Sequence, residues 1–248
     1  MTTLQDTIRP RAKSSEWKAI VILILLVPVL WSPVILFRYV LFQPFNIPSS
    51  SMTPTLVVGD FVFAAKYAYG YGRYSVPFAP SFITGRFLAA DPAYGDVVVF
   101  TTPKDTTVDY IKRVVGLPGD RIQMRQGQLF INDTPVARVA LKDVTAGSAC
   151  GGDVGTRGKR WRETLPNGAS YITYDCVDNG FLDNTPVYTV PPGHFFALGD
   201  NRDNSTDSRM MSAIGFVPMD NLVGTVTRIF WSLDSRGELR AERLGKVG

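Results

Sequence analysis

The chain has 248 residues, which is enough for a membrane anchor and one sizeable domain. Its net charge of +4 comes mostly from residues 1–38, where five basic side chains face two acidic ones, so the rest of the chain is almost neutral. This distribution excludes a broad basic face for nucleic acid. Two cysteines and one histidine are also too few for a zinc site built from these two residue types alone.

The first predicted element is an uncharged apolar run over residues 19–37. At 1.5 Å per residue, a helix of this length spans about 28 Å, close to the hydrocarbon thickness of a bilayer. Trp17 and Lys18 lie at one end of the run, and Arg38 and Tyr39 lie at the other. We therefore expect a transmembrane helix over residues 19–37.

The charges around this run predict its orientation. Four Lys/Arg side chains come before it and one follows directly, which places residues 1–18 in the cytoplasm and the remainder on the outer face. A cleaved signal peptide is the alternative, but the run is long and no small-x-small site follows it before Phe45. No later apolar run approaches the length of a second span, so we expect only one.

The sequence beyond the span favours a mainly β fold, because short runs of Val, Ile, Phe and Tyr are separated by frequent Gly and Pro turns. Residues 133–190 are interpreted as an insertion into a core formed by residues 42–132 and 191–248, and residues 141–170 as polar and irregular. We expect strands near residues 56–67, 95–100, 109–115, 121–131, 169–177, 195–198 and 222–233.

Residues 70–92 are rich in Gly, Pro and aromatic side chains, which predicts an extended surface loop or an irregular hairpin. Two interpretations of the aromatic side chains stay open at this point. Tyr74, Phe78, Phe82 and Phe87 either enter the lipid interface or pack beneath their own loop.

The two cysteines, Cys150 and Cys176, also allow two interpretations. Outside the cytoplasm they can pair, and a disulfide closing a loop of about 27 residues typically stabilises a protein by roughly 3 kcal/mol. Two free buried thiols are the alternative. The predicted outer location favours the disulfide.

Residues 48–56 (PSSSMTPTL) place three consecutive hydroxyls between prolines, about ten residues beyond the span. We interpret Ser51 as a nucleophile. Its base is unlike that of a Ser-His-Asp triad, because the one histidine, His194, follows Pro-Pro-Gly and fits a turn. That leaves a lysine, and Lys112 lies in a predicted apolar strand beside Ile111.

A lysine acts as a base only when its pKa is depressed. An ordinary lysine is neutral in roughly one molecule in 2,500 at pH 7, and burial in an apolar strand raises that fraction. The loop over residues 199–209 (GDNRDNSTDSR) is either a solvated turn or a hydrogen-bonded scaffold that orients Lys112. As a calcium loop it fails, because from Asp203 the sixth position is Ser208 and the twelfth is Ile214.

Four segments in this order after an N-terminal span, residues 49–56, 95–100, 109–120 and 199–209, resemble the motif boxes of bacterial type I signal peptidase. The resemblance extends from the span to about Phe230 and is weakest over residues 70–92 and 133–190. It implies an antiparallel β-sheet catalytic core with an inserted β cap subdomain. It also implies cleavage of N-terminal signal peptides by a Ser/Lys dyad, without metal or cofactor, on the periplasmic face of the inner membrane.

Roles of single residues follow from the resemblance. Ser51 corresponds to the nucleophile and Lys112 to the general base, while the Ser49 hydroxyl and the Ser51 N–H correspond to the oxyanion hole. The family commonly has Gly where this chain has Ser50, and both functional hydroxyls are retained. The residues that support the lysine correspond to Ser205, Asp207 and Arg209. Those that line small apolar substrate pockets correspond to Phe45, Ile47, Met52, Leu56, Tyr110 and Ile111.

The expected partners are therefore preprotein signal peptides with a small-x-small cleavage site and the lipid bilayer, and no nucleic acid. One alternative is a dedicated Ser/Lys processing peptidase for a single secreted, pilus or conjugation substrate. The span argues against a self-cleaving DNA-bound repressor of the same chemistry. A membrane-tethered binding protein with a dead site is the alternative from another class, and the joint presence of Ser51, Lys112 and Ser205 argues against it.

Overall fold

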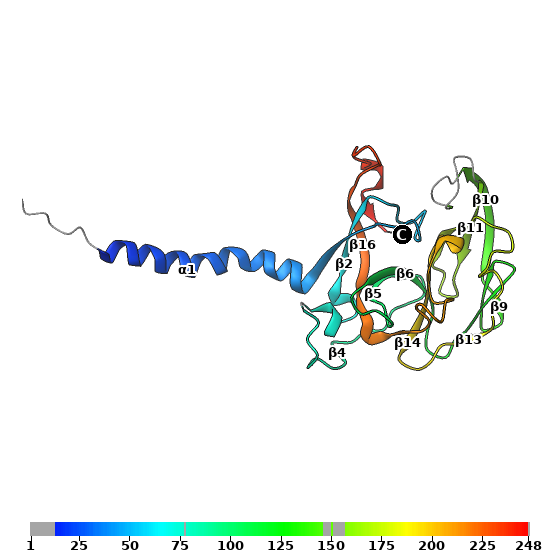
Figure 1. Ribbon diagram of the computed structural model, residues 1–248, viewed down its shortest axis with the longest axis horizontal. Coiled ribbons are helices and arrows are strands. Elements are labelled where there is room, and N and C mark those ends of the chain that lie inside the picture. Colours follow the sequence, from blue (N-terminus) through cyan, green and yellow to red (C-terminus); the bar gives the residue numbers. More distant parts are fainter. Residues whose placement is uncertain (1–12, 77, 146–149, 151–156, 248) are drawn as a thin grey trace, which may run out of the picture.

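The computed structural model describes residues 13–76, 78–145, 150 and 157–247. A long helix projects from one side of a β-rich domain (Figure 1). The helix, α1 (Lys13–Leu36), continues as one π-helical turn (Phe37–Leu41) that leads directly into the first strand.

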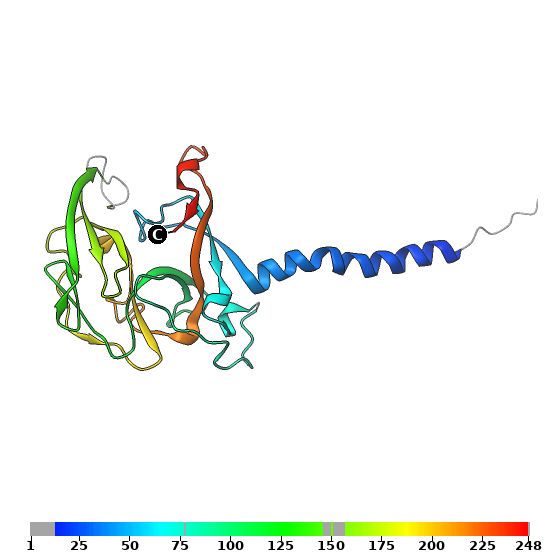
Figure 2. The same ribbon diagram turned by 180° about the vertical axis from the view of Figure 1, so that it is seen from behind.

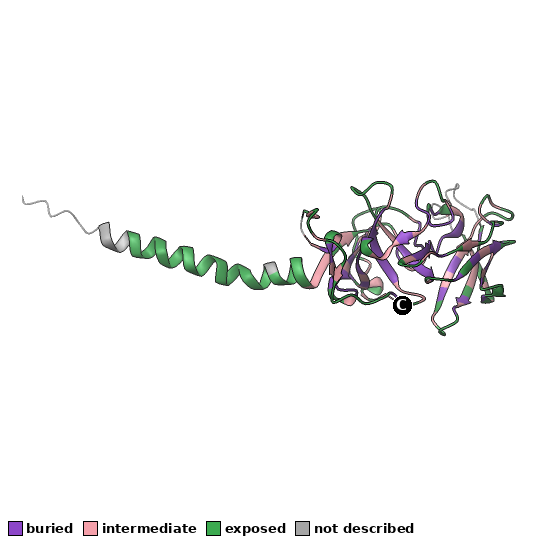
Figure 3. Cartoon of the chain, turned by 90° about the horizontal axis from the view of Figure 1, so that it is seen from below, coloured by how far each residue is buried: buried purple, intermediate pink, exposed green. Residues whose placement is uncertain are grey.

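The apolar helix is long enough to cross a membrane, over Trp17–Leu41. None of the apolar stretch of this helix is buried against the rest of the chain. Figure 3 colours the helix as exposed where its side chains are described. A helix that is apolar all round needs an apolar surrounding, which a bilayer supplies. The range predicted from the sequence, residues 19–37, lies within this helix.

An eight-stranded antiparallel sheet forms the larger part of the domain. Its order is β1-β2-β16-β5-β6-β14-β15, with β17 paired to β16, and it brings the segment after the helix next to strands from both ends of the chain. The strands are β1 (Phe42–Asn46), β2 (Asp60–Ala65), β5 (Val97–Thr101), β6 (Asp109–Gly116), β14 (His194–Leu198), β15 (Val217–Pro218), β16 (Leu222–Ser232) and β17 (Gly245–Lys246).

Two further sheets lie on the side of the domain away from α1 (Figure 2). One has the order β10-β11-β12 and the other β13-β7-β8-β9, and a short hairpin pairs β3 with β4. Their bounds are β3 (Tyr71–Gly72), β4 (Arg86–Phe87), β7 (Arg121–Arg125), β8 (Gln128–Ile131), β9 (Thr134–Pro135), β10 (Ala137–Thr145), β11 (Arg157–Thr164), β12 (Ser170–Asp175) and β13 (Tyr188–Thr189). Single 3-10 turns occupy Lys66–Ala68, Arg73–Ser75, Arg202–Asn204, Met219–Asn221 and Ala241–Arg243.

The mainly β fold class is confirmed. The irregular character predicted for residues 141–170 is wrong at 141–145 and 157–164, which form strands, while residues 146–149 and 151–156 lie outside the described residues. Strands β10 and β11 pair across this range from Ala137 with Thr164 to Thr145 with Arg157. They carry many polar side chains because much of this sheet faces solvent, so they lack the apolar alternation that marks a strand in the sequence. The division at residues 133 and 190 stays a prediction; β13, inside the predicted insertion, pairs with β7 outside it.

The loop 70–92 contains the β3–β4 hairpin, and three of its phenylalanines do not pack beneath it. Phe78, Phe82 and Phe87 are 101, 83 and 71% exposed, whereas Tyr74 is half-buried. At the other side of the domain, Cys150 and Cys176 are joined in a disulfide.

Asp60 is a buried carboxylate that fastens β2 to the end of β16 and to the C-terminal segment. It accepts hydrogen bonds from Ser232 Oγ (2.7 Å), Arg243 Nη2 (2.7 Å) and the Val57 N–H (2.9 Å). Burial raises the pKa of this carboxyl, but the hydrogen bonds, with Arg243 first, more than offset burial and leave the pKa below its ordinary value. The charge is therefore part of the fold at neutral pH.

Asp60→Ala is expected to lower the free energy of unfolding by about 3 kcal/mol, because Arg243 and Ser232 lose a buried partner. Thermal unfolding of the full chain in detergent at pH 7 measures the loss, with the exposed-site variant Asp91→Ala as the control. Since the native pKa is lowered, the stabilisation is present above the unfolded pKa of about 3.9 and is lost as the pH falls through the native value. Equal unfolding midpoints for Asp60→Ala and the parent chain at pH 7 would contradict this account.

Candidate active site

Two buried apolar side chains anchor the loop that carries Ser51 to the core. Met52 is 2% exposed and Leu56 is fully buried, and both pack in the core cluster that contains Val62 and Val99 of the large sheet. The Leu56 N–H donates to the Met52 carbonyl (2.9 Å), which closes a turn. Ser51 therefore sits on a loop whose apolar residues fix it to the sheet.

Lys112 lies on β6, between β5 and β14, and its side chain reaches this loop. Lys112 Nζ is 2.8 Å from Ser51 Oγ and 3.1 Å from the Ile111 carbonyl oxygen. The two residues are 4 and 8% exposed. The strand thus places an amine at hydrogen-bonding distance from a hydroxyl that is 61 residues away in the sequence.

Burial lowers the pKa of Lys112 to about 8, against the opposing charges of Asp207 and Asp200 and with a smaller lowering effect from Arg209. At pH 7 a lysine with this pKa is neutral in about one molecule in ten. A neutral amine accepts the hydroxyl proton, so the arrangement supplies a base without a histidine. His194, which the sequence predicted in a turn, is the first residue of β14 directly after the turn at residues 192–193, and its Nδ1 lies 2.9 Å from the Pro192 carbonyl oxygen.

Asp207 and Arg209 form a buried pair in the loop after β14. Arg209 Nε donates to Asp207 Oδ1 (2.9 Å) and Nη2 donates to Oδ2 (2.8 Å), and the Gly199 N–H donates to Oδ2 as well (3.1 Å). Burial raises the pKa of Asp207, but Arg209 outweighs burial and holds the pKa below its ordinary value. The pair keeps the loop rigid behind Lys112.

Ser205 is buried, and a side-chain hydrogen bond with it is among the causes that hold the pKa of Asp207 below its ordinary value. The contact with Lys112 that the resemblance implies is not among the hydrogen bonds observed within the part of the chain that the structure describes. Ser205 lies close to Gly199, where a Cβ would be 2.1 Å from Ser205 Oγ and 2.6 Å from the Ser51 carbonyl oxygen. Only glycine fits at position 199 without moving one of them.

Ser49 is exposed, and its Oγ lies 3.3 Å from Ser51 Oγ. Ser50 faces the other way, toward the loop after β14, where its Oγ accepts a hydrogen bond from Asn204 Nδ2 (2.6 Å). The backbone also joins the two loops, because the Asn201 N–H donates to the Ser51 carbonyl oxygen (3.1 Å). The three serines thus have different surroundings.

A hollow of about 500 Å³ opens beside Ser51 and Lys112. Five of the six predicted pocket residues line it: Phe45, Ile47, Met52, Tyr110 and Ile111. Leu56, the sixth, is buried in the core beneath the loop. Val108, Asn204 and Thr206 also line the hollow and were not predicted, because their side chains carry no pattern that marks a pocket.

The sequence interpretation also missed a buried ion pair that joins two of the motif segments. Arg113 donates from Nε and Nη2 to the two oxygens of Asp200 (2.8 and 2.7 Å), and its guanidinium carbon lies 4.2 Å from the ring centre of Tyr171 on β12. Opposite charges within the two motif segments were the available signal. The pair connects β6, the loop after β14 and the sheet β10-β11-β12, which we call the outer sheet.

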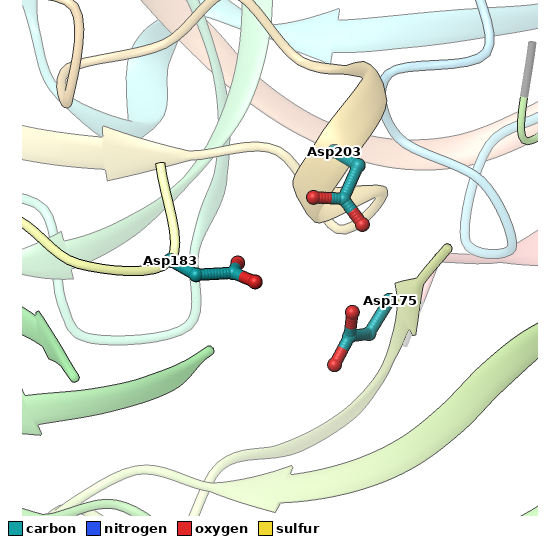
Figure 4. A group of neighbouring side chains, drawn as sticks. All are labelled: Asp175, Asp183 and Asp203. Atoms are coloured by element: carbon teal, nitrogen blue, oxygen red, sulfur yellow. The ribbon is translucent and has the colours of Figure 1, made fainter. Parts of the chain in front are cut away.

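The one group of carboxylates close enough to hold a metal ion within the described ranges is Asp175, Asp183 and Asp203, shown in Figure 4. Asp203 Oδ2 accepts the N–H groups of Cys176 and Val177 (2.7 and 2.9 Å). Burial, with the charges of Asp203 and Asp183, raises the pKa of Asp175 to about 6. We interpret the group as a junction between β12 and the loop after β14, and assign no metal to it.

The family model described as signal peptidase, peptidase S26, matches residues 14–231. Signal peptidase I of Rickettsia typhi is 41% identical over 204 residues, which cover 79% of this chain and 74% of that protein. Signal peptidase I of Rickettsia canadensis is 36% identical over 231 residues, which cover 90 and 81% of the two chains.

Among solved structures, a signal peptidase I from Enterococcus faecalis is 26% identical, with a TM-score of 0.32, and the match covers 56% of this chain and 98% of that one. Because this TM-score is low, the fold class is based on the strands described above. The family match and the relatives place the chain among the serine endopeptidases. It belongs to the signal peptidase family, peptidase S26.

The depressed pKa of Lys112 makes the stability of the chain depend on pH. The native pKa is about 8 and the ordinary value is 10.5, so the unfolded chain binds more protons between these values and stability rises with pH across this window. Relative to Lys112→Met, the parent chain should be less stable at pH 7 by up to about 3 kcal/mol. The difference should close as the pH approaches the ordinary value.

Thermal unfolding of both chains in detergent at several pH values measures this difference. Lys142→Met, which replaces an exposed lysine, is the control and should follow the parent chain at every pH. Parallel stability curves for the parent and Lys112→Met would mean that the native pKa of Lys112 is not depressed.

Proposed function

We propose that this chain is a membrane-anchored endopeptidase that removes N-terminal signal peptides from exported proteins with a Ser51–Lys112 dyad. One observation carries the proposal: a buried lysine amine lies 2.8 Å from a serine hydroxyl at the edge of a hollow. Membership of the signal peptidase family supplies the reaction class. The dyad assigns that reaction to particular atoms.

In the proposed mechanism, neutral Lys112 takes the Ser51 proton as Ser51 Oγ attacks the scissile carbonyl carbon. The tetrahedral intermediate collapses to an acyl-enzyme when Lys112, now an ammonium, protonates the leaving amine. Lys112 then takes a proton from water, whose oxygen attacks the ester carbonyl carbon. As the C–O bond to Ser51 breaks, Lys112 returns this proton to Ser51 Oγ and the acyl group leaves as a carboxylic acid. The proposed steps use no metal or cofactor.

The oxyanion of the tetrahedral intermediate needs hydrogen-bond donors that stabilise its negative charge. We assign this role to the Ser49 hydroxyl and the Ser51 N–H. The 3.3 Å separation between the Ser49 and Ser51 hydroxyl oxygens supports the assignment, because both groups face the same hollow.

We assign the orientation of Lys112 to Ser205, Asp207 and Arg209. The Asp207–Arg209 pair is buried and its hydrogen bonds fix the loop behind the lysine. The burial of Ser205 beside Asp207, whose charge acts on Lys112, supports its share of this role.

Substrate choice is assigned to the apolar wall of the hollow, formed by Phe45, Ile47, Met52, Tyr110 and Ile111. These side chains favour small apolar groups next to the scissile bond, as found at the small-x-small end of a signal peptide. We place residues 1–18 in the cytoplasm and the catalytic domain on the periplasmic face of the inner membrane. The exposed apolar helix and the charge asymmetry around it support this placement.

Ser51→Ala and Lys112→Met should each lower kcat/KM for a preprotein in detergent by at least about 1,000-fold, because the nucleophile and base act as one unit. Ser50→Ala is the matched control and should cleave at close to the parent rate. An acylating probe should label the parent and Ser50→Ala but not Ser51→Ala. Normal turnover by Ser51→Ala or Lys112→Met would remove the dyad from the mechanism.

A panel of unrelated preproteins distinguishes general processing from a dedicated peptidase. Cleavage of most members with similar kcat/KM supports the general function. Cleavage of a single secreted, pilus or conjugation substrate would favour the narrower one.

The pH dependence of the reaction should report the base. With a Lys112 pKa of about 8, kcat/KM should rise about tenfold per pH unit below that value and level off above it. Initial rates on a peptide substrate between roughly pH 6 and 10 give the profile. A midpoint near the ordinary lysine pKa, or a flat profile, would be inconsistent with a buried lysine base.

A further inference from the structure

A second hollow, of about 360 Å³, lies where the apolar helix enters the β domain. We call it the Lys66 hollow. Its wall includes Arg38 and Tyr39 from the π-helical turn, Lys66 after β2, and Phe78 from the exposed loop. It shares only Asp109 with the lining of the hollow beside Ser51. It is therefore a separate feature at the end of the helix.

Lys66 is unusual among the buried basic residues. It is 3% exposed, and within the described ranges its ammonium has neither a hydrogen bond nor an ion pair. In contrast, buried Arg113, Arg202 and Arg209 each pair with a carboxylate, and Lys112 contacts Ser51. Lys66 Nζ is not among the fully buried polar atoms that lack a partner, so the ammonium keeps accessible surface in the wall of the hollow, where it can pair with an anion.

The charges around Lys66 favour an anion as well. Among the described residues that line this hollow, Asp109 is the one acidic side chain opposing Arg38 and Lys66, which leaves one positive charge in excess. Burial lowers the pKa of Lys66, and the Asp109 carboxylate only partly offsets this effect. A bound anion would stabilise the ammonium form and supply the hydrogen-bond acceptor that it lacks.

The position of the hollow identifies the kind of anion. Lys66 directly follows β2, whose last residue, Ala65, pairs with Phe42, the first residue after the helix. The Tyr71 hydroxyl donates to the Val40 carbonyl oxygen (3.0 Å), which ties the β3–β4 region to the same turn. Tyr39 is 43% exposed and Phe78 fully exposed, as suits aromatic side chains at a membrane interface.

We propose that the Lys66 hollow binds the phosphate of an anionic phospholipid headgroup, with Lys66 and Arg38 as its cationic donors. This inference rests on the membrane anchoring proposed above but does not depend on the peptidase chemistry. The lipid contributes a non-covalent contact beside the helix end. It fixes the orientation of β1, and through β1 that of the loop carrying Ser51, relative to the bilayer.

The test uses the full chain in a neutral detergent, titrated with phosphatidylglycerol or with phosphatidylcholine, and counts retained lipid by native mass spectrometry. The parent chain should bind phosphatidylglycerol more tightly. Lys66→Met, which keeps the volume but removes the charge, should bind it about tenfold more weakly. Lys142→Met, on β10 far from the helix in Figure 1, is the matched control and should bind as the parent does.

Arg38→Gln is the second variant, because its side chain is exposed and its loss leaves the core intact. It should weaken phosphatidylglycerol binding several-fold, and it decides the matter if Lys66→Met does not fold. Parent-like binding in both folded variants, or in Arg38→Gln alone where Lys66→Met is unfolded, would overturn the proposal. So would equal affinity for the two lipids.

A parallel arm with inorganic phosphate separates a lipid from a free anion. The proposal expects millimolar phosphate to compete poorly with phosphatidylglycerol. Lys66-dependent binding of phosphate together with no retained lipid would overturn the lipid assignment. Ser51 labelling by an acylating probe should persist in Lys66→Met. Labelling of the parent chain without selective binding of phosphatidylglycerol would mean that the lipid proposal alone has failed, and selective binding without labelling would mean that the Ser51–Lys112 proposal alone has failed.

Discussion

Lys112 can accept the Ser51 proton only in its neutral form, and the two nearby carboxylates of Asp207 and Asp200 disfavour that form, so the surrounding charges determine how much of the base is available. Burial lowers the pKa of Lys112, while Asp207 and Asp200 act against it. Each of these carboxylates has its own bidentate arginine partner, Arg209 and Arg113. The arginines reduce the field that would otherwise hold the lysine as an ammonium, so the buried pairs serve the proposed base as well as the fold.

Buried polar contacts of the loop after β14 and of Arg113 also join the outer sheet to the core. Arg113 lies against the ring of Tyr171, and Arg202 pairs with Glu163 on β11. The Tyr174 N–H donates to the Asp200 carbonyl oxygen (2.9 Å), so β12 is hydrogen-bonded to the loop that carries the lysine's neighbours. Movement of the outer sheet would therefore disturb the electrostatic surroundings of Lys112, although no residue of that sheet lines the hollow beside Ser51.

Local sequence patterns predicted the apolar helix and the buried strands, because buried segments contain runs of apolar residues. They also predicted the two segments that meet at the site, because each is a short continuous motif. Local patterns failed where a feature depends on contacts between residues that are far apart in the sequence. β1 was missed because Pro44 interrupts a five-residue strand that is defined by pairing with β2. Arg113 and Asp200 are 87 residues apart, and their pairing depends on the register of β6 against β14, which no local pattern encodes.

β1 also determines the distance between the end of the helix and Ser51. Its five residues run without a break from the π-helical turn and pair with β2 along their whole length. A strand of this length extends about 16 Å, and its pairing prevents the variation in length that a free linker would have. For the proposed membrane-embedded substrate, a scissile bond reaches Ser51 only if it lies at that distance from the bilayer. The position of the cleavage site relative to the apolar segment of the substrate would then be selected by the sheet, in addition to the side chains that line the hollow.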